Sequence, residues 1–281
     1  MKIKISSLVR KALLCLSVIG FANVAMAQTF DEPVITFKTN IYDSHGEANQ
    51  FSLVIGTKAE NQYVDVDCGF GKIEYEVQPA YMDSLNQMGG TLISCQVSKE
   101  GIVKIYADPS QIDYFNASGC YISSIEFNNC NNLIILDLTH NELKGLDLSN
   151  LTNLQALYVS DNTFSAESPL KIGKNKPNLT ILEMNTIEHL DPEFNISDYP
   201  NLMSFDGYHN MGLKQIDPSG CPNLMRLTVD VTDIESVDVS KNPYLTVLNV
   251  SNTKVTSLDI SKNPYLLELY CDHYGSYNYE Y

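Results

Sequence analysis

A short pattern of apolar residues repeats through the second half of the 281-residue chain. In its clearest form it reads leucine-x-x-leucine-x-leucine-x-x-asparagine-x-leucine, with Leu133, Leu136, Leu138, Asn141 and Leu143 at the defined positions. A period of 21 to 25 residues indicates stacked units, each of which buries its apolar side chains against its neighbours. The eight copies begin at residues 112, 133, 154, 179, 202, 224, 245 and 266.

Each unit carries a second, shorter apolar pair, such as Leu146 and Leu148 or Val237 and Val239. These pairs alternate with a period of two and leave no room for a long helix. The unit is therefore a strand, a turn, an extended segment on the opposite side and a second turn. We predict a mainly β chain with a solenoid of about eight coils over residues 112–281, whose convex segments are short and extended.

The ninth position of the unit is expected to hold the turns together. An asparagine there can satisfy backbone groups that the turn leaves unpaired, and Asn141, Asn162 and Asn210 occupy it. Three other units place smaller polar side chains at this position, namely Cys120, Thr232 and Thr253.

The repeats resemble the leucine-rich-repeat family. The segments 146–149 (Leu-Asp-Leu-Ser) and 241–245 (Lys-Asn-Pro-Tyr-Leu) look like the short repeats of surface proteins from Bacteroides-type gut bacteria, and the resemblance covers about residues 112–273. It implies adhesion or contact with a host protein. The fourth unit departs from the pattern, because Ile187 leaves it without a ladder asparagine and residues 165–175 lengthen the preceding loop.

Residues 28–111 have a different texture, with alternating segments separated by glycine turns. This texture predicts a small β-sandwich of immunoglobulin-like size, which would cap the open end of the solenoid. The stretch 64–72 resembles a hairpin of N-terminal modules attached to such repeats. The alternating segments are 51–55, 63–67, 73–77, 92–97 and 102–106.

The first 27 residues have the organisation of a signal peptide. Lys2, Lys4, Arg10 and Lys11 precede an apolar stretch that ends in Ala-Met-Ala at residues 25–27, so cleavage is expected before residue 28. A lipoprotein, anchored at Cys15, is the less favoured alternative. We therefore expect export to the periplasm, the cell surface or the medium.

Charge and hydropathy restrict the partners. The net charge is -16, and removal of the basic leader would take it to -20, which argues against nucleic acid and anionic membranes. No apolar run long enough to span a bilayer follows residue 27, so we expect no transmembrane segment in the mature chain.

Motifs for catalysis and for metal or cofactor binding are missing from the sequence. There is no nucleophile elbow, no phosphate-binding loop and no histidine pair at helical spacing. His140, His209 and His273 share a column, but three coils separate neighbours by about 14 Å, too far for one zinc ion. The segment that contains Asp65 and Asp67 has too few oxygen ligands for a calcium loop. We predict no catalytic residue, no metal and no cofactor.

The cysteines left after removal of the leader are too sparse for a disulfide framework. Cys130 and Cys221 occupy the same turn position about 19 Å apart, beyond disulfide reach, and are expected to be small core residues. Cys68 and Cys95 either pair within the N-terminal segment or remain buried thiols.

The third and fifth positions of each unit point away from the core, so they predict two columns of side chains on the strand face. Tyrosines, acids and amides in these columns are typical of an interaction surface. The candidate ligand-binding residues are Tyr114, Asn116, Asp137, Tyr158, Glu183, Asp206, Arg226, Asn249 and Tyr270.

The sequence therefore predicts an exported, non-catalytic adhesion protein whose strand face binds a protein ligand, such as a host surface or matrix protein. The alternative is a glycan-binding accessory protein that uses the sandwich module or the tyrosine-rich end. The tyrosines of residues 270–281 either stack on sugars or seal the last coil. A hydrolase is the third hypothesis, and only Glu183 and Asp206 are close enough to serve as its carboxylate pair.

Overall fold

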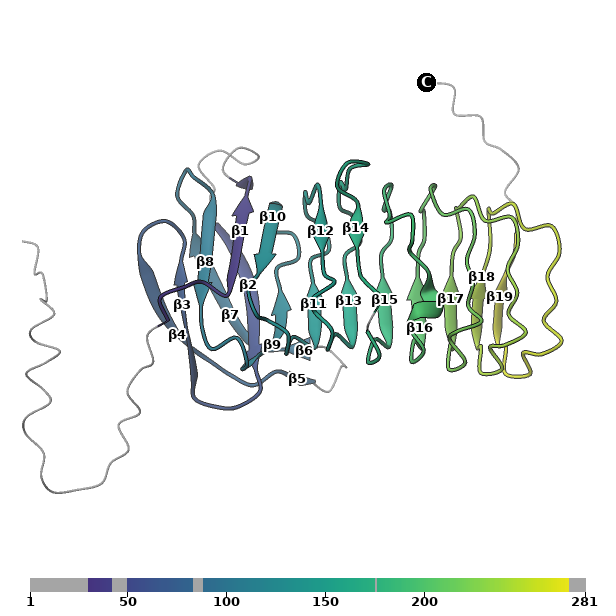
Figure 1. Cartoon of the computed structure of the whole chain (residues 1–281), viewed down its shortest axis with the longest axis horizontal. Coiled ribbons are helices and arrows are strands. Elements are labelled where there is room, and N and C mark those ends of the chain that lie inside the picture. The colour runs from purple at the N-terminus through teal and green to yellow at the C-terminus, as the bar shows by residue number, and fades with distance from the viewer. Residues whose placement is uncertain (1–29, 42–49, 83–87, 175, 273–281) are drawn as a thin grey trace, which may run out of the picture.

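The computed structural model describes residues 30–41, 50–82, 88–174 and 176–272, which form an elongated molecule of strands and turns (Figure 1). The predicted signal peptide, Cys15, His273 and the tyrosines of residues 274–281 lie outside the described residues. Within the described ranges, no helix is long and apolar enough to cross a membrane.

Eight short strands stack in parallel along the long axis of the molecule. Each begins two residues after the start of a sequence repeat or, for β9, at that start, so the predicted period and strand positions are confirmed. Seven turns of a mainly β solenoid join the eight strands. The strands are β9 (Ile112–Asn116), β11 (Ile135–Asp137), β13 (Ala156–Tyr158), β15 (Ile181–Glu183), β16 (Ser204–Asp206), β17 (Arg226–Thr228), β18 (Val247–Asn249) and β19 (Glu268–Tyr270).

The leucines of the repeat form a continuous core inside these turns. Leu133, Leu136 and Leu138 are fully buried, as are Leu224 and Leu227 several coils further on. Each such side chain contributes roughly 1.5–3 kcal/mol by leaving water. Because every coil buries its leucines against both neighbours, stability is shared along the stack.

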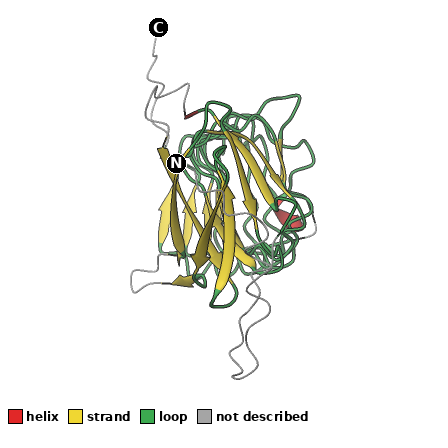
Figure 2. Cartoon of the chain, turned by 90° about the vertical axis from the view of Figure 1, so that its left-hand side faces the viewer, coloured by secondary structure: helices red, strands yellow, loops and turns green. Residues whose placement is uncertain are grey.

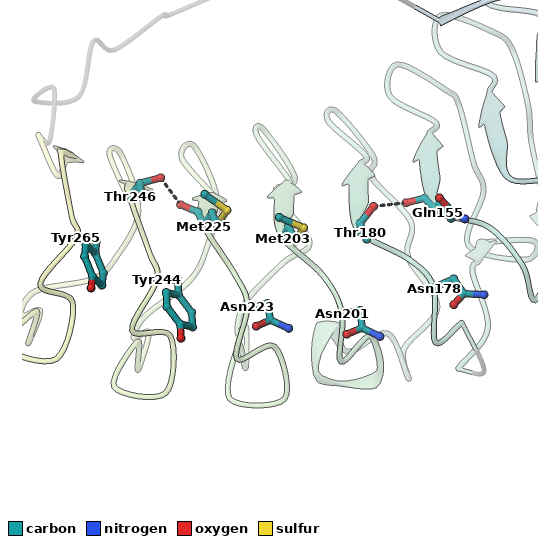
Figure 3. A pocket seen from close by; sticks show the side chains of 10 residues that line it. All are labelled: Gln155, Asn178, Thr180, Asn201, Met203, Asn223, Met225, Tyr244, Thr246 and Tyr265. Atoms are coloured by element: carbon teal, nitrogen blue, oxygen red, sulfur yellow. Dashed lines mark hydrogen bonds between the residues drawn. The ribbon is translucent and has the colours of Figure 1, made fainter. Parts of the chain in front are cut away.

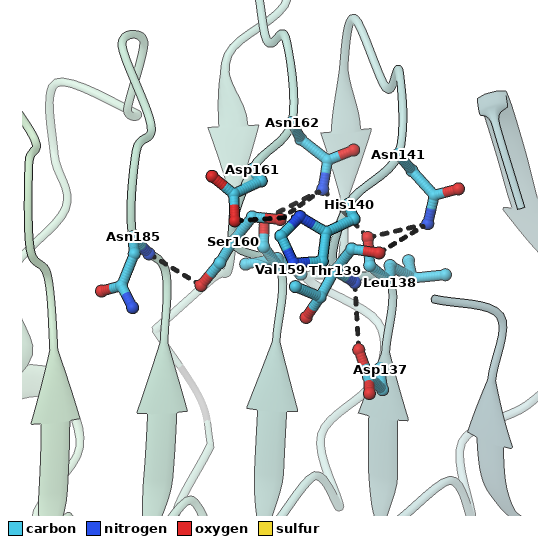
Figure 4. A network of polar contacts seen from close by, with 10 residues as sticks. All are labelled: Asp137, Leu138, Thr139, His140, Asn141, Val159, Ser160, Asp161, Asn162 and Asn185. Atoms are coloured by element: carbon cyan, nitrogen blue, oxygen red, sulfur yellow. Dashed lines mark hydrogen bonds and ion pairs between the residues drawn. The ribbon is translucent and has the colours of Figure 1, made fainter. Parts of the chain in front are cut away.

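The predicted asparagine ladder is confirmed (Figure 4). Asn141 Oδ1 accepts hydrogen bonds from the backbone nitrogens of Cys120 and Ile122 at 3.1 and 2.9 Å. Its Nδ2 donates to the carbonyl oxygens of Ala117 and Leu138, both at 2.9 Å. One side chain thus satisfies four backbone groups in two coils.

The threonines at the same position act as simpler ladder residues. Thr232 and Thr253 each donate a hydroxyl hydrogen bond of 2.7 Å to a carbonyl oxygen of their own coil. In the irregular fourth unit Ile187 stands at this position, and its backbone nitrogen donates to Asn210 Oδ1 of the next coil. This is the regular ladder bond of Asn210, equivalent to the bond from the Leu143 nitrogen to Asn162 Oδ1, so the fourth unit contributes no ladder side chain of its own at this position.

A second ladder at the opposite turn was not predicted. Asn242 Nδ2 donates to the carbonyl oxygens of Pro218 and Cys221 at 2.9 and 2.8 Å, and Asn263 repeats this arrangement one coil later. The repeated Lys-Asn-Pro-Tyr-Leu segments were its sequence signal. The Lys176 side chain takes this place in the fourth unit, and its Nζ donates to two backbone carbonyls.

The eighth position of the unit has a left-handed backbone. The φ angle is positive at Gly119, where glycine adopts it without strain, but also at residues with a Cβ. Val231 is β-branched, and its φ of 55° is unfavourable for such a side chain. The other eighth-position residues with positive φ are His140, Asp161, Thr186, His209 and Asn252.

Strands from the N-terminal segment continue the solenoid sheet. β2 (Gln50–Thr57) pairs antiparallel with β9 on one side and with β7 (Thr91–Gln96) on the other, which gives one ten-stranded sheet. β2 therefore covers the strand edge of the first coil. The ten-stranded sheet therefore contains strands from both sides of the domain boundary that the sequence analysis placed between residues 111 and 112.

A second sheet lies at the same end of the molecule, as the end-on view of Figure 2 shows. Phe37 and Phe51 join the two sheets in an edge-to-face contact with ring centroids 5.7 Å apart. Four of the five alternating segments of the sequence lie wholly in strands, and the fifth, 92–97, extends one residue beyond the end of β7. In order, the second sheet contains β10 (Ile122–Phe127), β1 (Ile35–Thr39), β8 (Ile102–Tyr106), β3 (Gln62–Asp67) and β4 (Lys72–Val77).

Two minor ladders complete the described structure. The lengthened loop before the fourth unit contains β14 (Leu170–Lys171), which pairs with β12 (Leu146–Asp147) one coil earlier. β5 (Tyr81–Met82) pairs with β6 (Met88–Gly89). A short 3-10 turn, η2 (Ile196–Asp198), precedes β16.

Candidate binding face

The strand register places the candidate residues in two columns. Across the sheet, the fifth-position residues pair in the order Asn116, Asp137, Tyr158, Glu183, Asp206, Thr228, Asn249 and Tyr270. The third-position residues run parallel to them as Tyr114, Ile135, Ala156, Ile181, Ser204, Arg226, Val247 and Glu268. We call these two columns the strand face. The structure thus brings all nine candidate residues into these two columns, although Tyr114 is buried, with 4% of its surface exposed.

The N-terminal end of the strand face is ordered by hydrogen bonds. Asn116 Nδ2 donates to Asp137 Oδ2 at 3.0 Å and lies 3.3 Å from the Tyr114 hydroxyl. The other oxygen of Asp137 accepts from the Thr139 backbone nitrogen. Burial raises the pKa of the hydroxyls of Tyr114 and Tyr158. These side chains therefore present a pre-organised surface rather than mobile groups.

The middle of the strand face carries half-buried carboxyl groups. Burial is the largest cause of the raised pKa of Glu183, and repulsion from Asp206 and Asp137 adds to it. Burial likewise raises the pKa of Asp206 and of Asp230, two residues beyond the fifth-position column. Oδ1 of Asp230 is buried without a hydrogen-bond partner. These carboxylates lack full charge compensation within the protein.

One cation lies within the two columns. Arg226 is exposed, and its charge lowers the pKa of Glu183 and Asp206 without offsetting the effect of burial. At the C-terminal end, Tyr270 is 48% exposed and donates a hydrogen bond of 3.0 Å to Glu268. The face therefore runs from an ordered polar end, through an acidic centre, to an exposed tyrosine.

The chemistry of this surface favours binding. Glu183 and Asp206, the pair considered for hydrolysis, lie on adjacent strands. Neither lines either of two cavities found along the described solenoid, of about 740 and 320 Å³. Among the described residues, no three histidine, cysteine, aspartate or glutamate side chains gather as a metal site. Half-buried carboxylates of this kind attract a cationic group of a partner.

The histidine column contains a contact between a histidine and a carboxylate that the sequence analysis missed. His140 Nδ1 lies 3.1 Å from Asp161 Oδ2 of the next coil, and both residues occupy the eighth position (Figure 4). The sequence feature that could have predicted this contact is the spacing of 21 residues between the two side chains, which is one repeat. The contact joins two neighbouring turns on the solvent side, since the His140 side chain is 67% exposed.

The six described cysteines are free. Cys130 and Cys221 are buried in the turns, as predicted, and each thiol donates to a backbone carbonyl. Cys68 and Cys95 are buried thiols hydrogen-bonded to each other, which raises the pKa of Cys68 and lowers that of Cys95.

Residues 132–154 match the family model described as Leucine Rich Repeat. Together with the solenoid, this match supports a leucine-rich-repeat protein. No curated protein sequence matches the chain.

Solved structures of similar shape include three bacterial proteins. The functional domain of InlJ from Listeria monocytogenes is 22% identical, with a TM-score of 0.48, and the match covers 60% of this chain and 42% of InlJ. LIC12759 of Leptospira interrogans is 23% identical, with a TM-score of 0.44, and the match covers 52% of this chain and 38% of LIC12759. Internalin C2 of Listeria monocytogenes is 20% identical, with a TM-score of 0.46, and the match covers 63% of this chain and 79% of internalin C2. The chain thus spans less than half of the first two.

Proposed function

We propose that this protein is an exported, non-catalytic binding protein that engages a protein ligand through its strand face. The observation that carries the proposal is the register that lines up tyrosines, amides and carboxyl groups on one continuous surface. Tyrosine is enriched at the energetic centres of protein interfaces, and the surrounding polar groups orient the partner.

The electrostatics of the strand face point to a basic partner surface. The carboxyl groups of Glu183, Asp206 and Asp230 are held partly out of water, where each charged form is disfavoured. A lysine or arginine side chain of the partner would relieve this cost on binding. The proposed ligand is therefore a host surface or matrix protein with exposed positive charge, and the protein is an adhesin of a Bacteroides-type bacterium.

Arrays of extracellular host proteins and of glycans test this proposal. We expect a protein hit whose affinity falls at least tenfold in the double variant Tyr158→Ala and Asp137→Ala, because these changes remove an aromatic anchor and an orienting carboxylate. Exposed Tyr63, in β3 of the N-terminal segment, supplies the control variant Tyr63→Ala. Unchanged affinity in the double variant would overturn the assignment of the binding face.

A further inference from the structure

A second surface runs along the flank of the solenoid. Two rows of side chains line a groove of about 740 Å³ at the amino-terminal ends of the strands (Figure 3). One row precedes the first leucine of each unit, and the other follows it. The rows are Asn178, Asn201, Asn223, Tyr244 and Tyr265, and Gln155, Thr180, Met203, Met225 and Thr246.

None of these ten residues is charged, although the chain carries 34 acidic and 18 basic residues. A basic peptide, a nucleic acid or an anionic lipid would find no complementary charge here. The groove is therefore suited to a neutral ligand, in contrast to the acidic strand face.

The C-terminal end of the groove offers aromatic surface. The rings of Tyr244 and Tyr265 are stacked, with centroids 6.3 Å apart and planes inclined by 15°. Both side chains are more than half exposed, and Met203 and Met225 expose apolar surface beside them. Aromatic rings and thioethers of this kind provide flat apolar contact area, onto which the C–H face of a sugar ring can pack.

The asparagine side chains of the groove have unused hydrogen-bonding capacity. Asn201 Nδ2 donates to the Pro177 carbonyl at 2.7 Å, which leaves its oxygen free, and within the described chain the amides of Asn178 and Asn223 make no hydrogen bond to protein. A carboxamide donates and accepts at once, as a sugar hydroxyl does. The row therefore matches a ligand rich in hydroxyl groups.

The backbone amide groups along the groove already make hydrogen bonds within the protein, which argues against a peptide ligand. The amide nitrogens of Met203, Met225 and Thr246 all donate to carbonyl groups of the preceding coil at 2.8 Å. An extended peptide would bury its own amide and carbonyl groups against them without backbone partners, at a cost in free energy.

The lining repeats with each coil. From the coil of Gln155 to that of Tyr265 it spans about 24 Å at the usual spacing of strands. A ligand whose chemistry also repeats can use every coil. We propose that this flank groove binds a neutral, linear oligosaccharide, with Tyr244 and Tyr265 as its stacking platform. The proposal is independent of the strand face.

The chain has no tryptophan, so the variant Tyr244→Trp introduces a single fluorescent reporter into the groove. We would titrate it with linear neutral hexose and pentose oligomers of four to six units, with hyaluronan and heparin as charged controls and an uncharged apolar peptide as the competing class. The account predicts a saturable change in emission with a neutral oligosaccharide and none with the charged polymers or the peptide.

Calorimetry on the native chain then locates the site. Affinity for that oligosaccharide falls at least tenfold in the double variant Tyr244→Ala and Tyr265→Ala, less in the matching phenylalanine variant, and not at all in Tyr208→Ala, which removes an exposed tyrosine from another turn. Thermal unfolding confirms that each variant folds. Absence of binding to every neutral oligomer, binding of the peptide instead, or full affinity in the alanine variant would each overturn the proposal.

Discussion

Glu183 and Asp206 are paired across the neighbouring strands β15 and β16, and the pKa of each carboxyl group is raised. The protein therefore holds two acids side by side in a partly dehydrated position, where their charge opposes folding. This arrangement fits the proposed basic partner, which would supply the missing positive charge on binding.

The first prediction concerns Glu183→Gln. The folded-state pKa of Glu183 lies above its ordinary value of 4.5, so its contribution to stability declines as the pH rises through and above that value. Removal of the charge should stabilise the protein by about 0.5 kcal/mol at pH 7, a figure reduced for the solvent that reaches the side chain. Urea unfolding at pH 7 and pH 4 should show this gain disappearing at the lower pH.

The control for that measurement is Glu126→Gln, which neutralises an exposed glutamate of β10. It should leave the stability of the protein nearly unchanged at pH 7. A loss of stability in Glu183→Gln at neutral pH would show that this carboxylate has a compensating partner and would contradict the electrostatic description.

The second prediction concerns the asparagine ladder. Asn162 accepts from the Leu143 backbone nitrogen at 3.1 Å and donates to the carbonyls of Leu138 and Val159 at 3.0 Å. Asn162→Ala should cost about 3 kcal/mol, because it leaves buried backbone groups unpaired. Asn162→Thr should cost less, since threonine serves at this position elsewhere in the stack. Chemical denaturation of both variants tests the order, and equal losses would contradict it.

The third prediction concerns the left-handed turn. Val231 has a φ of 55°, which asparagine tolerates far better than a β-branched residue. Val231→Asn should therefore stabilise the protein by about 1 kcal/mol. Val231→Ala, which keeps the Cβ, should gain less. Thermal unfolding would contradict this account if the asparagine variant melted at a lower temperature than the native protein.

The fourth prediction concerns Lys176. Burial lowers its pKa to about 8 from 10.5, while Nζ donates to the carbonyls of Leu148 and Leu151 at 2.7 and 3.1 Å. The unfolded chain binds this proton more tightly, so the stability of the native protein should rise between pH 8 and pH 10.5. The free energy of unfolding of the native protein, measured relative to that of Lys176→Met, should rise by up to about 1 kcal/mol per pH unit in this range.

Denaturation across that range of pH tests the buried lysine. The exposed neighbour Lys174 supplies the control variant Lys174→Met, which should follow the native protein at every pH. A stability difference between the native protein and Lys176→Met that does not change with pH would contradict the lowered pKa of the buried amine.

The repeat made much of the solenoid predictable. Leucines at fixed spacing must face inward in every coil, so the residues between them must line up outward, as Asp137 and Tyr158 do. The alternating N-terminal segments likewise identified strands. The sequence predicted that the N-terminal segment caps the open end of the solenoid, but not that β2 pairs with β9, because strand pairing over that distance leaves no periodic signal in the sequence.

The features that sequence reasoning missed lie in the turns. Lys176 looks like a surface residue, and only the structure shows that it replaces an asparagine of the second ladder. The flank groove combines residues on both sides of the first leucine of each unit, such as Tyr244 and Thr246. Its shape depends on how the turns stack, which the pattern of leucines does not specify.

Affinity for the protein partner found on the array is the most direct test of the strand face. It should be measured for the native protein, for Glu183→Gln with Asp206→Asn, and for the groove variant Tyr244→Ala with Tyr265→Ala. The account predicts at least a tenfold loss and a weaker salt dependence in the first variant, with native affinity in the second. Native affinity in the carboxamide variant, or a loss confined to the groove variant, would contradict it.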